Sequence, residues 1–205
     1  MAGTMSRADL VLSLKESLLD AAGAFPAAAD ADFQRHIDTA AADMHRVRPR
    51  TLLGEVTLTA DVGEYAGPAD LMRFKSALWG VQPDWSAAKP WEKTWPGRLP
   101  RCRVLDDGSL SLSPPPTAQQ ISLLGSAYRF YYVGRDAVGT LAADTTIVAA
   151  DRDILLLRAQ AEAMHELAMR DSVRPVQVGG GFGQHAKTGT PQALWESMMT
   201  AWLFS

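Results

Sequence analysis

The sequence predicts an α+β protein in which a small bundle of about four helices carries a β-rich insertion between its second and third helices. Apolar residues repeat with helical spacing near both ends of the chain, whereas short alternating runs separated by turn residues occupy the middle. An apolar fraction of 47% and a charged fraction of 21% are typical of a chain with a packed core. We therefore expect a helical core over residues 1–50 and 145–205, a β-rich insertion over 51–144, and a glycine-rich linker over 174–189 that leads to the last helix.

The first fifty residues predict two helices. The first spans Ser6 to Ala22, because Ser6 can cap its amino end and leucines recur at every fourth position. Its apolar face consists of Leu10, Leu14 and Leu18. The second begins at Asp30 or Asp32 and runs to about Arg48, with small alanines that allow another helix to approach. Its apolar face consists of Phe33, Ile37, Met44 and Val47.

The middle of the chain predicts several short strands. Alternating, β-branched or aromatic runs indicate strands over residues 55–59, 71–79, 103–105, 110–112 and 127–133. Asp107 and Gly108 have the residue types of a tight hairpin turn between the third and fourth of these runs. The three prolines from Pro114 to Pro116 end the pairing after it.

Helical spacing returns near Asp151. Apolar residues then fall on two faces of one helix, which predicts a central helix packed between neighbours. Its polar stripe consists of Arg158, Glu162, Glu166 and Arg170. A last helix is expected from Thr190, which can cap it, with Pro191 at the first helical position, where proline fits best.

The last helix carries the predicted partner interface. Large apolar side chains at the end of a chain either fold back on the core or enter a groove on another protein, because exposed apolar surface is unfavourable. The residues alone leave both outcomes open, and the candidate partner interface is a set of six residues. They are Trp195, Met198, Met199, Trp202, Leu203 and Phe204.

No catalytic, cofactor or metal site is predicted. The run from Gly181 to Thr188 imitates a phosphate-binding loop, but no buried strand precedes it and the next helix begins too late. His165 and Glu166 begin a zinc-protease pattern that Met169 breaks, since a second histidine must stand there. Arginines flank Cys102 and could lower the pKa of its thiol, yet we expect a small apolar strand residue instead.

Charge and targeting signals exclude several classes of protein. A net charge of −3 argues against a protein devoted to gripping nucleic acid. One basic bias, seven Lys or Arg against three Asp or Glu between Gly67 and Arg103, indicates a solvated face or a contact with an acidic subunit. The tryptophans from Trp79 to Trp95 fit loop packing or protein contacts equally well. With no secretory or membrane-spanning pattern, we expect a protein that stays in the cytoplasm, or in a particle assembled there, and that has no membrane partner.

Several passages together resemble the head-to-tail adaptor (connector or neck) proteins of tailed bacteriophages. The resemblance rests on the helix start at Asp32-Phe33, the run from Thr57 to Tyr65, and Pro68-Ala69-Asp70-Leu71. It continues in the strand from Tyr128 to Val133 and the alanine-rich helix from Leu155 to Met169. The chain departs from the family at Gly67, where an apolar residue is common, and in the tryptophan-rich stretch.

This resemblance implies a structural virion protein of the phage neck and not an enzyme. Such adaptors form a ring, usually a dodecamer, below the portal protein, extend the DNA channel, help to retain packaged DNA, and dock stopper or tail proteins. DNA would pass through without sequence-specific binding, and the last helix would reach the portal. Two alternatives stay open, a stopper or tail-completion subunit of the neck, and a small nucleotide-binding enzyme that uses Lys187 and Thr188.

Overall fold

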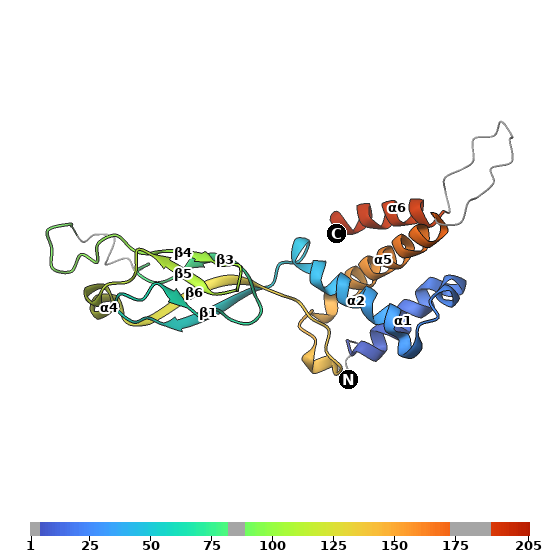
Figure 1. Cartoon of the computed structure of the whole chain (residues 1–205), viewed down its shortest axis with the longest axis horizontal. Helices are drawn as coiled ribbons and strands as arrows, with labels where there is room; N and C mark the ends of the chain where they lie inside the picture. The colour runs from blue at the N-terminus through green and yellow to red at the C-terminus, as the bar shows by residue number, and fades with distance from the viewer. Residues whose placement is uncertain (1–4, 82–88, 173–189) are drawn as a thin grey trace, which may run out of the picture. The chain divides into compact units, whose positions relative to one another are not determined.

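The computed structural model describes residues 5–81, 89–172 and 190–205, and the chain divides into two compact units. One unit comprises Met1–Arg48 with Asp136–Ser205, and the other comprises Pro49–Arg135. The described residues form five α-helices and two antiparallel three-stranded sheets, so the predicted mixture of helix and strand is confirmed (Figure 1).

Four helices form the first unit. They are α1 (Arg7–Leu18), α2 (Ala31–Asp43), α5 (Arg152–Ser172) and α6 (Pro191–Leu203). The predicted cap is present, because the amide of Asp9 donates to Ser6 Oγ over 3.2 Å. Both amino-terminal helices end earlier than predicted, and each continues as a 3₁₀ turn, Leu19–Ala24 after α1 and Met44–Arg46 after α2. Propensity and apolar spacing do not separate these two helix types at helix ends.

Helix α5 lies at the centre of this unit, as its two apolar faces predict. It contacts α1, α2 and α6. Leu155 and Ala159 are fully buried, because neighbouring helices cover a wide part of the surface of α5. The main core members from α1 and α2 are Leu10, Leu14, Phe33, Ile37 and Ala40.

The second unit holds the strands. They are β1 (Thr51–Thr57), β2 (Glu64–Tyr65), β3 (Leu71–Ala77), β4 (Arg101–Val104), β5 (Leu110–Ser113) and β6 (Ala127–Gly134). One sheet has the order β1-β6-β3 and the other β2-β5-β4, with every pair antiparallel. Tyr128, Phe130 and Tyr132 on alternate positions of β6 share one core with Leu110 and Leu112 of β5.

A short helix, α4 (Ala118–Leu124), lies before β6 and was not predicted. Its sequence signal is nevertheless plain. Thr117 and Gln120 form a reciprocal capping box, in which each side chain accepts from the other residue's amide. The run of prolines before it hid this signal, because prolines indicate the end of pairing and not the start of a helix.

At two positions of the second unit, the backbone conformation or a close contact requires a glycine. Gly108 adopts φ +82° in the predicted hairpin between β4 and β5, where Leu105 donates its amide to the Ser109 carbonyl over 2.9 Å. At Gly67, a Cβ atom would lie 2.4 Å from the backbone oxygen of Gly108. This close approach explains why a glycine stands where the adaptor pattern has an apolar residue.

Candidate partner interface

Helix α6 begins as the sequence predicts. Thr190 caps it, since the amide of Ala193 donates to Thr190 Oγ1 over 3.3 Å, and Pro191 occupies the first turn. The helix packs along α5 (Figure 1). Trp195 stacks on His165 of α5, with ring centroids 5.0 Å apart. One side of α6 therefore belongs to the core of its own unit.

The six residues of the predicted interface separate into two groups. Trp202 is fully buried, and Trp195 and Met198 are partly buried against the helical core. By contrast, Leu203 is 56% exposed and Phe204 is 87% exposed, while Met199 is intermediate. Since half-buried and buried side chains already have neighbours, the free apolar surface at this end of α6 consists of Leu203 and Phe204.

A buried cation holds α6 in place. The guanidinium carbon of Arg158 lies 5.7 Å from the ring centroid of Trp202, within the range of a cation–π contact. Arg158 also forms ion pairs with Asp43 at 2.8 Å and Glu162 at 2.9 Å. The sequence predicts Arg158 on the polar stripe of its helix, and the residue is only 7% exposed. The stripe is covered at this position, because the Trp202 ring of α6 and Asp43 of α2 lie against the guanidinium.

The end of the described chain is tied to the same unit. Arg48 donates a hydrogen bond to the Ser205 carbonyl over 2.9 Å and forms an ion pair with Asp151 at 3.4 Å. Ser205 also donates its hydroxyl to the Trp202 carbonyl. These contacts fix the backbone on both sides of Phe204, so its exposed ring is presented from an anchored segment.

A second charged network joins α2 to α5. Glu166 accepts hydrogen bonds from His36 Nε2 at 2.8 Å and from Arg35 at 2.5 Å, and it pairs with Arg170. Burial alone would raise the pKa of Glu166, but the hydrogen bonds from His36 and Arg35 and the nearby positive charges lower it below 4.5. The carboxylate is therefore a fixed negative charge between the two helices.

Cys102 lies in β4 as a half-buried residue. Burial raises the pKa of its thiol to about 11. The flanking arginines do not produce a thiolate near neutral pH. This environment fits the predicted apolar strand residue and not a nucleophile.

The remaining predicted motifs do not gather into a site. The run from Gly181 to Thr188 lies outside the described residues, as does Trp85. In the part of the chain that the structure describes, no three His, Cys, Asp or Glu side chains could hold a metal ion. Trp79 is buried and donates to the Gly125 carbonyl, whereas Trp91 is 78% exposed. No helix among the described residues has the length and apolarity to cross a bilayer.

Comparison with known protein families gives one match. The model of a family described as SU10 adaptor protein matches residues 5–200, which is nearly the whole chain. No curated protein matches the sequence. The matched range includes both structural units and all but the last residues of α6.

Proposed function

Because this chain belongs to the SU10 adaptor protein family, a family of phage head-to-tail adaptors, we propose that it forms a ring below the portal protein and docks the tail. As an adaptor it is a structural virion protein that interacts with portal and tail proteins. We propose a ring of twelve copies, as the resemblance to phage adaptors implies. Its channel continues that of the portal and helps to retain packaged DNA.

The observation that carries the portal contact is the exposed end of α6. Phe204 and Leu203 are exposed while Trp202, directly before them, is fully buried. An aromatic side chain held out from an anchored helix end loses little conformational entropy on binding, which suits an anchor residue in a partner's pocket. We propose that these two side chains enter a groove on the portal, and that the helical segments form a core into which the β-rich segment is inserted.

Point substitutions test this proposal better than removal of the helix, because Trp202 belongs to the core. Leu203→Ser with Phe204→Ser should leave the thermal unfolding midpoint within about 2 °C of the wild type, since both residues are exposed. The same variant should lose at least about tenfold in affinity for the purified portal, because truncated anchors cost about 2 kcal/mol or more.

Leu141→Ser with Val148→Ser is the control, because both residues are exposed aliphatic side chains of the same unit. The control should bind the portal normally. Equal binding by both variants would remove α6 from the portal contact. Electron microscopy of assembled necks then separates an adaptor next to the portal from a stopper or tail-completion subunit next to the tail.

A further inference from the structure

Exposed positive charges lie on two neighbouring edge strands of the second unit. The edge strands β3 and β4 lie next to each other there. Four exposed side chains, which we call the basic edge, come from these strands. They are Arg73, Lys75, Arg101 and Arg103. None of the four forms an ion pair with a carboxylate among the residues that the structure describes; Lys75 donates to Thr51 Oγ1 instead. Leu105, directly after β4, adds a side chain that is 38% exposed.

In the helical unit, by contrast, most positive charges are paired with carboxylates. Its arginines and lysines engage carboxylates of the same unit in a series of ion pairs. The pairs are Arg7–Asp38, Lys15–Asp30, Arg46–Asp43, Arg48–Asp151, Arg158–Glu162 and Arg170–Glu166. Arg152 is engaged as well, since it donates to Ser13 Oγ of α1 and lies 3.9 Å from Asp153. An exposed carboxylate of this unit that forms no such pair among the described residues faces solvent, where a cation of a partner can reach it.

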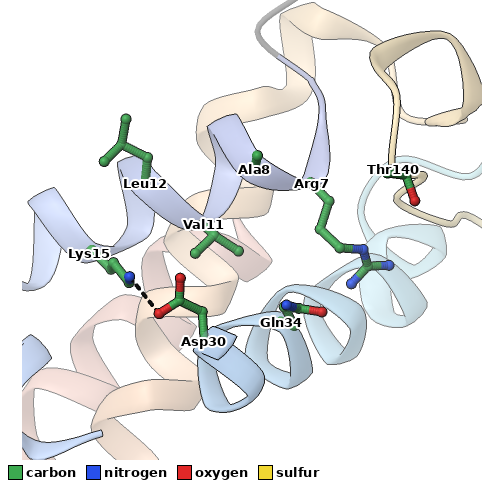
Figure 2. Close-up of a pocket in the computed structure, with 8 residues that line it drawn as sticks. All are labelled: Arg7, Ala8, Val11, Leu12, Lys15, Asp30, Gln34 and Thr140. Atoms are coloured by element: carbon green, nitrogen blue, oxygen red, sulfur yellow. Dashed lines mark ion pairs between the residues drawn. The ribbon is translucent and has the colours of Figure 1, made fainter. Parts of the chain in front are cut away.

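Two such carboxylates lie in the last turn of α1 and in the 3₁₀ turn Leu19–Ala24 that follows it. Glu16 and Asp20 are exposed and have no ion pair within the described ranges. Beside them are two large apolar side chains, Leu12 at 57% and Leu19 at 78% exposure. We call these four residues the acidic face. Figure 2 shows Leu12 projecting from α1 on the side away from Asp30.

Sequence spacing explains why the acidic face was missed. The buried leucines Leu10, Leu14 and Leu18 account for the apolar stripe of α1, so their spacing gives no sign that Leu12 is exposed. Leu12 and Glu16 lie four positions apart on α1 and therefore on one face, whereas Leu19 and Asp20 belong to the 3₁₀ turn that follows. Leu19 also holds φ +50°, a conformation that is unfavourable for a non-glycine residue and that here carries an exposed leucine.

The groove next to the acidic face does not provide cations that neutralise its carboxylates. It lies between α1 and α2 and is lined by Arg7, Lys15, Asp30 and their neighbours (Figure 2). Lys15 and Asp30 pair across it at 2.5 Å, and Arg7 pairs with Asp38. Its cations are therefore occupied, and the groove does not neutralise Glu16 or Asp20.

We propose that the acidic face of α1 in one copy binds the basic edge of a second copy. The two surfaces are complementary in charge, and each carries exposed apolar area beside its charges, the arrangement of a protein–protein contact. Because the two surfaces differ, the contact is heterologous and repeats from copy to copy. This inference rests on the proposed ring and names the surfaces that join its subunits.

Two other uses of the basic edge lead to different outcomes. Charges on edge strands can simply prevent sheets from pairing edge to edge, in which case their sign does not matter. Clustered cations can also bind nucleic-acid phosphates. The protein's net charge of −3 and the matching carboxylates on α1 favour a second copy over both.

Two charge-reversed variants of the full chain, measured separately and then mixed, test the inference. One variant carries Glu16→Lys and Asp20→Lys, and the other carries Arg101→Glu and Arg103→Glu. Each alone should assemble at least about tenfold less well than the wild type, in solution or on the portal, because like charges then face each other. An equimolar mixture should recover assembly, since every contact between unlike copies again joins opposite charges. Native mass spectrometry should find the two variants in equal amounts in the restored assemblies.

Matched controls carry the same change in net charge at other exposed sites. Asp144→Lys with Asp153→Lys, and Lys89→Glu with Lys93→Glu, should assemble as the wild type does. Normal assembly by both reversed variants, or reversed variants that the mixture does not rescue, would overturn the inference while the ring proposal stands. Loss of DNA binding without loss of assembly would also overturn it, in favour of a phosphate contact. A wild-type protein that never assembles, even with the portal, contradicts the ring proposal itself.

Discussion

Arg158 lies against the ring of Trp202, with its guanidinium carbon 5.7 Å from the ring centroid, and both residues are buried. The same guanidinium pairs with Asp43 of α2 and Glu162 of α5. One side chain therefore connects three helices. This contact decides which part of α6 belongs to the core and which part is free for a partner.

Replacement of Trp202 tests the core role of α6. Trp202→Ala should lower the free energy of unfolding by about 3–5 kcal/mol, because a large buried ring is lost. Trp202→Phe should cost less than about 1.5 kcal/mol, since the Trp202 Nε1 atom is buried without a hydrogen-bond partner in the described structure. Urea unfolding followed by circular dichroism measures both values. Equal losses for the two variants would contradict this account.

Removal of Arg158 tests the buried ion pair. Arg158→Ala should destabilise the protein by about 1.5–3 kcal/mol, because Asp43 loses the closer of its two cations and keeps Arg46 at 3.4 Å. The double variant Arg158→Ala with Asp43→Ala should lose less unfolding free energy than the sum of the two single variants. The difference is the coupling energy between the two side chains. Additive losses would show that the two residues do not act as a pair. Thermal unfolding of the four proteins in the cycle supplies the data.

The Glu166 network predicts a loss of stability in acid. The folded-state pKa of Glu166 is lowered below 4.5, so the folded state favours the ionised carboxylate. Its contribution is fully present above pH 4.5 and is lost as the pH falls through the lowered folded pKa. The difference in unfolding free energy between the wild type and Glu166→Gln should therefore shrink below pH 4.5. A difference that stays constant from pH 7 to pH 3 would contradict this assignment.

The pKa of Cys102 predicts slow thiol chemistry. Since burial raises this pKa to about 11, the thiol is protonated at neutral pH. Alkylation by iodoacetamide should accelerate about tenfold per pH unit from pH 7 to pH 10 without reaching a plateau. A plateau near pH 9 would indicate an unperturbed thiol. Cys102→Ala should leave assembly unchanged, because the residue fills space in a strand.

Gly67 provides a test of the second unit. A Cβ atom there would lie 2.4 Å from the Gly108 backbone oxygen and 2.8 Å from a methyl of Leu71. Gly67→Ala should therefore cost about 1–3 kcal/mol, since backbone must shift. Gly125→Ala is a contrasting variant, because its Cβ meets nothing within 4 Å although φ is +84°. Comparison of the two separates steric overlap from backbone strain in thermal unfolding measurements.

Local patterns in the sequence determined most of the elements. The Ser6 and Thr190 caps, the hairpin at Gly108 and the aromatic strand β6 depend on residues close together in the chain, so spacing and turn chemistry predicted them. The family resemblance rested on such short passages as well. By contrast, α4 was missed although Thr117 and Gln120 carry its capping signal, because the prolines before it dominated the interpretation.

Only the tertiary structure decided which apolar and charged side chains are covered. The sequence placed Trp202, Leu203 and Phe204 in one interface, yet Trp202 lies in the core and Phe204 is 87% exposed. It placed Arg158 on a polar stripe, yet α6 covers that residue. Burial depends on contacts between residues far apart in the chain, such as Asp43 with Arg158, and no local spacing encodes such contacts.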